Sequence, residues 1–113
     1  MKKLKIGFRP AHRELMGEAF AVEMREFYIK KLSSIKEMEL IYPDENLTKK
    51  GLVRDLEDSK AIINVFSEKK IDGIILGALN YGDERSALTI VENFYNLPIF
   101  IFGTAEPEIP KDN

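Results

Sequence analysis

The chain has 113 residues, with 17 basic and 19 acidic side chains, one histidine and no cysteine. This length suits a single domain, and the balanced, scattered charges exclude the basic patch that binding to nucleic acid or an anionic membrane requires. The lack of cysteine excludes disulfides, thiolate metal sites and a cysteine nucleophile, and no apolar run approaches the roughly 20 residues of a membrane span. A soluble, cytoplasmic protein is expected.

Residues 4–8 alternate between apolar and other side chains, which predicts a first strand. Arg9 and Pro10 are expected to end it, because proline has no backbone N–H to donate. From about residue 12 to residue 35, apolar side chains recur every three or four positions, which predicts a helix with one buried face. That face consists of Met16, Phe20, Met24, Phe27, Tyr28, Leu32 and Ile35.

A short strand is predicted over residues 38–42, closed by Pro43 and Asp44 and followed by the polar stretch 45–50. A second amphipathic helix comes next. Its predicted inner stripe is Leu52, Leu56, Ile63 and Phe66.

Two later stretches, "DGIILGAL" from Asp72 and "PIFIF" from Pro98, are almost uniformly apolar, as strands covered on both faces are. The residues between them have helical spacing and predict a third helix that ends before Pro98. The apolar positions of that helix are Ala87, Leu88, Val91, Phe94 and Tyr95.

The predicted order is therefore β-α-β-α-β-α-β. Helical crossovers between strands are right-handed and give a parallel sheet with helices on both faces. The fold class is α/β, a three-layer open parallel sheet of the flavodoxin-like kind, with strand order 2-1-3-4. Residues 1–104 form this domain, and residues 105–113, "AEPEIPKDN", form a linker or tail that is expected to lead to further domains.

In open parallel sheets, ligands bind beyond the carboxyl ends of the strands, where the strand order reverses. For order 2-1-3-4 that point lies between the first and third strands. Arg9 and His12 follow the first strand, and Asn80, Tyr81 and Asp83 follow the third. Their amide, phenol and carboxylate groups suit a neutral polyol, whereas a phosphate site would need a glycine-rich loop with a lysine.

A purely structural interpretation is also open. Gly82 can supply a turn, Asp83 can cap the third helix and Tyr81 can cover the edge of the core. Arg9 is either a solvated surface residue or a fixed guanidinium aimed at a ligand. His12, the sole histidine, has no cluster of acids beside it, so it predicts a surface position or the start of the helix, and no metal site is expected within the chain.

Three stretches, "KIGFRPAHRELMGEAF", "DGIILGALNYGDERSA" and "LPIFIFGTAEPE", resemble the amino-terminal domain of the L-fucose isomerase and L-arabinose isomerase superfamily, over nearly the whole chain. In that family the first strand ends in Ile-Gly-apolar-Arg-Pro, and a Gly-Asp/Ser-Glu turn follows the third strand. Arg9, Pro10, Gly82, Asp83 and Glu84 match these positions. The fucose-type enzymes carry an aromatic residue near the turn, and Tyr81 is the residue here that can take that role.

The resemblance implies an aldose–ketose isomerase that works through an enediol, with Mn²⁺ or a similar divalent ion held by Glu, Asp and His of later domains. It also implies that the first domain closes over the active site of a neighbouring subunit in a homo-oligomer. On this basis Arg9, Asn80, Tyr81 and Asp83 are expected to contact the sugar, with His12 and Glu84 as further candidates. The expected partners are the sugar and the remaining isomerase domains or neighbouring subunits, with no nucleic acid and no membrane.

The chain alone is expected to be inactive, because one histidine in 113 residues does not assemble both the metal site and an acid/base pair. The alternative is a stand-alone flavodoxin-like module that binds a sugar or regulates a partner.

Overall fold

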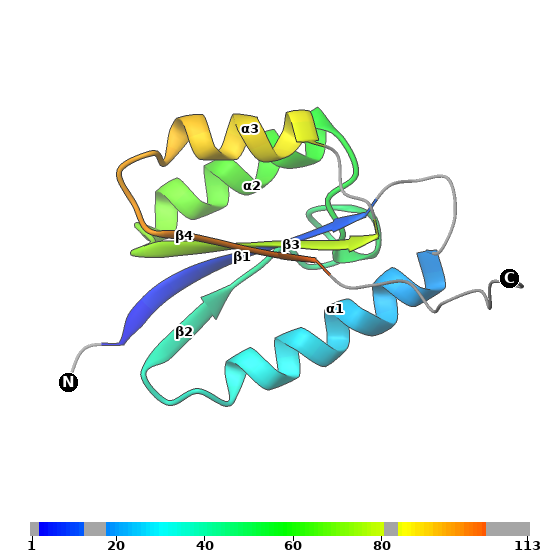
Figure 1. Ribbon diagram of the computed structural model, residues 1–113, viewed down its shortest axis with the longest axis horizontal. Coiled ribbons are helices and arrows are strands. Elements are labelled where there is room, and N and C mark those ends of the chain that lie inside the picture. Colours follow the sequence, from blue (N-terminus) through cyan, green and yellow to red (C-terminus); the bar gives the residue numbers. More distant parts are fainter. Residues whose placement is uncertain (1–2, 13–17, 81–83, 104–113) are drawn as a thin grey trace, which may run out of the picture.

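The computed structural model describes residues 3–12, 18–80 and 84–103, and it has three layers (Figure 1). A parallel sheet forms the middle layer, helix α1 covers one face, and helices α2 and α3 cover the other. The elements are β1 (Leu4–His12), α1 (Glu18–Ser33), β2 (Met38–Ile41), the 3₁₀ turn η1 (Lys49–Gly51), α2 (Leu56–Lys69), β3 (Gly73–Asn80), α3 (Glu84–Asn93) and β4 (Ile99–Gly103). The predicted fold class is confirmed.

The four strands lie in the order β2-β1-β3-β4, which confirms the predicted order. All three pairs are parallel, and β1 pairs with both β2 and β3. The carboxyl ends of all strands therefore meet at one edge of the sheet. The predicted linker, residues 105–113, lies outside the described residues.

Strand β1 does not stop at Arg9 and Pro10 as predicted, but continues to His12. Strand β2 pairs with β1 only as far as Gly7, so no β2 residue lies beside Pro10. The Pro10 carbonyl accepts a hydrogen bond from the Val53 amide at 2.8 Å, on the side of β1 where β2 pairs with the earlier residues of the strand. Because the nitrogen and the carbonyl of a strand residue face the same side, the N–H that proline lacks is not one that β3 needs.

Helix α1 begins at Glu18, so the prediction of a helix from about residue 12 was wrong for His12, which lies in β1. The predicted buried face was also partly wrong. Ala21 and Arg25 are the buried residues of α1, whereas the side chains of Phe27 and Ile35 are 48% and 39% exposed. The hydrophobic spacing predicted the helix correctly, but it did not indicate that Arg25 lies on the buried face.

The main core lies between the sheet and the pair α2 and α3. Phe66 of α2 and Phe94, just after α3, meet edge to face with ring centroids 6.1 Å apart. The predicted stripe of α2 is right for Phe66, but Leu56 is 45% exposed, and Leu52 is buried ahead of the helix. Among the described side chains of α3, Ile90 is buried. The predicted apolar positions Leu88 and Tyr95 are 58% and 81% exposed.

Strand β4 is an edge strand, so the prediction that "PIFIF" is covered on both faces was wrong. Phe100 and Ile101 are 63% and 68% exposed. On the α1 side a row of rings, Phe27, Tyr28, Phe102 and Phe100, runs from the helix to this edge, with neighbouring centroids 5.1, 4.8 and 6.4 Å apart. Only α1 covers this face among the described helices (Figure 1), and its Tyr28 reaches Phe102 of β4.

None of the helices in the described ranges is both long enough and apolar enough to cross a membrane.

Candidate functional site

The ends of β1 and β3 form the centre of the candidate site. In the register of these parallel strands, His12 lies opposite Asn80. The register shifts just before this pair, because Ala11 pairs with Ala78 and Leu79 is left as an extra residue. Bulges of this kind are common at the rims of sheets beside active sites, where they redirect side chains. The structure thus brings two predicted site positions together on adjacent strands.

Other predicted site residues lie nearby in the chain. Glu84 is the first residue of α3. Tyr81, Gly82 and Asp83 lie outside the described residues, so the proposed sugar contacts of Tyr81 and Asp83 stay predictions. The same holds for the cap that Asp83 was expected to form.

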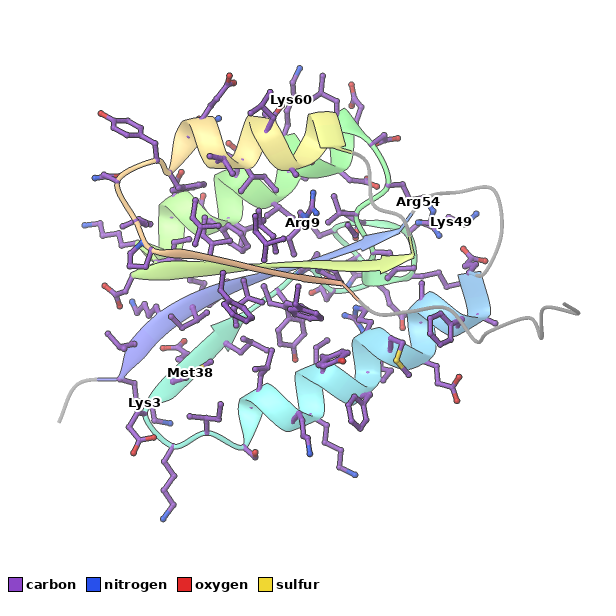
Figure 2. The ribbon with its side chains drawn as sticks, viewed as in Figure 1. Lys3, Arg9, Met38, Lys49, Arg54 and Lys60 are labelled. Carbon is purple, nitrogen blue, oxygen red and sulfur yellow. The ribbon has the colours of Figure 1, made fainter. Side chains whose placement is uncertain are left out.

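Arg9 is only 3% exposed, which excludes the interpretation of this residue as a solvated surface group. Its neighbour Phe8 stacks on Phe102 on the α1 side of the sheet, so Arg9 points to the opposite side, toward α2 and α3. Figure 2 shows Arg9 between the sheet and these helices. Arg9 also interacts with another residue. Arg9 is therefore a buried cation close to the carboxyl ends of the strands.

The segment between β2 and α2, residues 42–55, takes the place of β2 beside the end of β1. Val53 bridges to Ala11 in parallel fashion and donates its amide to Pro10. Leu52 and Val53 are fully buried. This segment, called the β2–α2 loop from here on, thus extends the sheet and forms one wall of the site.

Arg25 fastens the β2–α2 loop to α1. Its Nε donates to the Gly51 carbonyl at 2.9 Å, and its Nη2 donates to the Pro43 carbonyl at 2.8 Å. Nη1 pairs with Glu26 at 2.6 Å, and the guanidinium lies 5.6 Å from the centre of the Tyr42 ring. The two bonds to the loop carbonyls are buried, and such charge-assisted hydrogen bonds are stronger than those between neutral groups.

Arg54 makes a second connection between the loop and α1. Its Nη1 donates to the Lys49 carbonyl at 2.8 Å, and its Nη2 pairs with the carboxylate of Glu18 in the first turn of α1. Partial desolvation raises the pKa of Glu18, but the Arg54 hydrogen bond and the charges of Arg54, Lys49 and Lys50 outweigh it and lower this pKa below 4.5. The lysine side chains of η1 therefore lie within electrostatic reach of the start of α1.

The β2–α2 loop was not predicted to be part of the site. The stretch "KKGLVRD" contains one signal, a glycine after two lysines, which is typical of a turn with positive φ. Gly51 has a φ of 67°, and Lys50 before it has a φ of 59°. No pattern in the sequence indicates that Arg25, in the middle of an amphipathic helix, holds this loop.

A cavity of about 560 Å³ lies between β2, the first part of the β2–α2 loop and the C-terminal half of α2, and it is lined by Ile41, Tyr42, Leu47, Val65 and Lys69 among others. Within the ranges that the structure describes, no three His, Asp or Glu side chains gather as metal ligands would. The resemblance places the divalent ion on later domains, and that expectation stays a prediction.

The family model described as "Fucose/sulfoquinovose isomerase, N-terminal domain" matches residues 7–112. No curated protein and no solved structure showed significant similarity to the chain. The match covers nearly the whole chain, including both strand ends and the β2–α2 loop, and it agrees with the resemblance found in the sequence. The chain belongs to the family of N-terminal domains of fucose/sulfoquinovose isomerases.

Proposed function

We propose that this domain contributes substrate contacts to an aldose–ketose isomerase, and that the divalent ion and the acid/base groups of the reaction come from other domains. The observation that carries this proposal is the pairing of His12 with Asn80 at the carboxyl ends of adjacent strands. In a parallel sheet this is where ligands bind, and a sugar is the ligand class of the family.

In this proposal the turn after β3 supplies polar contacts to the sugar hydroxyls, with Asn80, Tyr81 and Asp83 as the contacting residues and His12 and Glu84 at its margin. Arg9, which is buried, acts by holding its charge close to the strand ends. The β2–α2 loop, fixed by Arg25 and Arg54, keeps the other wall of the site in place. A wall that is rigid before binding costs less ordering entropy on binding.

The test is a titration of the 113-residue chain with L-fucose, in which changes in the amide chemical shifts of NMR spectra report binding. We expect shifts at the ends of β1 and β3, and we expect Asn80→Ala to weaken binding. The matched control is Asn93→Ala, because Asn93 is exposed and its amide bonds only to the Thr89 carbonyl, 2.9 Å away in its own helix. Equal affinity of the two variants would contradict the role of Asn80, and shifts confined to other regions would contradict the site.

The partner of this domain is proposed to be another part of the isomerase, in the same chain or in a neighbouring subunit of a homo-oligomer. The exposed apolar edge of β4 supports a partner, because bare edges of this kind usually pair with another segment. The same edge is the observation that favours the second candidate function, a stand-alone binding or regulatory module.

The intact mass of the native polypeptide in its source cells distinguishes an isomerase domain from a stand-alone module. A mass several times 13.0 kDa would support a domain of a larger enzyme. A mass near 13.0 kDa would support a small protein that acts through a partner.

A further inference from the structure

We propose that the groove along β2 binds an extended segment of a partner protein. The segment adds to the sheet as an antiparallel strand and carries an apolar residue flanked by basic residues. This inference goes beyond the proposed function, because the groove lies along β2 and not at the ends of β1 and β3. It rests on the backbone of β2, on the shape of the groove and on the charge of its lining.

The backbone of β2 is open to pairing on one side, because β2 is an edge strand of the described sheet. The Glu37 carbonyl accepts from the Leu4 amide at 2.9 Å, so the backbone groups of Glu37 and of every second residue after it face β1. The amide and the carbonyl of Leu40 therefore face away from the sheet. In the antiparallel arrangement, which is the more stable one per residue, a peptide residue opposite Leu40 exchanges both hydrogen bonds with it.

The groove lies beside this open edge. Its lining includes Leu40 and Ile41 of β2, Leu47 of the β2–α2 loop and Val65 of α2. Ile41 belongs to the main core, so its side chain and that of Glu39 lie on the face of β2 that α2 covers. In an antiparallel pair, the residue opposite Ile41 places its side chain on this same face. An added strand thus directs one side chain into the apolar part of the groove, formed by Ile41, Leu47 and Val65.

Hydrogen bonds hold the loop wall of the groove in place. Oδ1 of Asp44 accepts from the amides of Asn46 and Leu47, each at 2.9 Å. The Pro43 carbonyl accepts from Nη2 of Arg25 at 2.8 Å, and this bond is buried. A wall that is already ordered loses little conformational entropy when a partner binds. A short segment can therefore bind here without first having to order the loop.

The charge of this edge determines the kind of partner. Residues 37–45 contain four acidic side chains and no basic one, and all four are exposed. Two of these acids, Glu39 and Asp44, line the groove, and Lys69 is the only base among the lining residues. A second copy of the chain, pairing through its own β2, would bring the same acids to this edge, and like charges placed opposite each other are unfavourable. Basic side chains on either side of the apolar residue suit the groove, with one of them opposite Glu39.

The experiment is an NMR titration of the 113-residue chain with a short peptide with blocked ends, Lys-Thr-Ile-Thr-Lys-Thr. Its isoleucine is set opposite Ile41, its second threonine opposite Leu40 and its second lysine opposite Glu39. The test variant is Leu40→Pro, which removes an amide that β1 does not use. The matched control is Leu40→Ala, which loses the same side chain but keeps the amide.

Two further peptides test the same contacts from the partner's side. One is N-methylated at the second threonine, which removes the amide that would donate to the Leu40 carbonyl. The other has glutamate in place of both lysines.

The lysine peptide is expected to shift the amide signals of β2, of residues 44–47 and of the C-terminal half of α2, and to slow hydrogen exchange of the Leu40 amide. Leu40→Pro and the N-methylated peptide should each lower the affinity at least about fivefold, as for one lost hydrogen bond. Leu40→Ala should lower it less, and the glutamate peptide should bind more weakly than the lysine peptide.

No binding of the lysine peptide, or signal changes confined to other parts of the chain, would overturn the groove as a binding site. Undiminished affinity for the N-methylated peptide would overturn strand addition, and this measurement needs only the unmodified chain if Leu40→Pro does not fold. Equal affinity for the glutamate peptide would overturn the assignment of a basic partner.

Discussion

Replacing Gly51 with alanine tests whether Arg25 holds the β2–α2 loop. A Cβ at Gly51 would lie 2.5 Å from Nη2 and 2.6 Å from Cζ of Arg25, so the guanidinium would have to move. The φ of 67° adds a left-handed penalty of about 1–2 kcal/mol for a residue with a side chain. Losing one of the two charge-assisted bonds to the loop carbonyls adds about 1.5–3 kcal/mol. The free energy of unfolding should therefore fall by about 2.5–5 kcal/mol.

Urea denaturation followed by circular dichroism measures this change, with Gly73→Ala as the control. The nearest atoms to a Cβ at Gly73 lie at 3.4 Å, and its φ is not positive, so this substitution should cost much less. A double-mutant cycle makes the test specific. When Arg25 is already alanine, Gly51→Ala should cost only the left-handed penalty of about 1–2 kcal/mol. An equal cost with and without Arg25 would show that this arginine does not hold the loop.

Three further predictions concern other parts of the chain. Gly7→Ala should lower the free energy of unfolding by about 1–3 kcal/mol, because its Cβ would lie 2.7–2.8 Å from the Phe66 ring, and the loss measured in urea should shrink when Phe66 is leucine. Glu18→Gln should reduce the loss of stability at acid pH. The lowered pKa of Glu18 stabilises the fold above pH 4.5, and this contribution is lost as the pH falls through the folded-state pKa. The urea midpoints at pH 7 and pH 3 should therefore differ less in the variant than in the unmodified chain. Phe100→Lys should change stability by no more than about 0.5 kcal/mol, because the side chain is 63% exposed, and light scattering should show less self-association; a large loss of stability would mean that this edge belongs to the core.

The strand order and fold class could be predicted because they depend on features that one sequence displays. The apolar stretch of β3 is long and uninterrupted, as a strand covered on both faces must be. The helical spacing after β1 and β2 requires crossovers, and the right-handed rule leaves few arrangements. That the ends of β1 and β3 lie side by side follows from the order of the strands, but the pairing of His12 with Asn80 was not predicted, because β1 was expected to end before His12.

The errors arise where a residue's neighbour is distant in the sequence. Pro10 remains within β1 because β2 is too short to reach it, and the length of β2 is not visible from β1. Arg25 is buried because its partners, the Pro43 and Gly51 carbonyls, come from a loop that carries no helical or strand pattern. The apolar character of β4 predicts cover on both faces, whereas the strand order, which was predicted correctly, places it at the edge of the sheet. The β2–α2 loop was missed for the same reason as Arg25.

The edge position of β4 also affects how fast the amides of the sheet exchange with water. The Pro98 carbonyl accepts from the Ile74 amide at 3.0 Å, so the backbone groups of Pro98 and of every second residue after it face β3. The alternate amides, those of Ile99 and Ile101, face outward, away from the sheet. Hydrogen exchange at these two amides should be fast, whereas amides of β1, which lies between two neighbours, should exchange only through larger openings. A segment that pairs with β4 would slow the outward amides first, so their exchange rates report directly whether the edge is occupied.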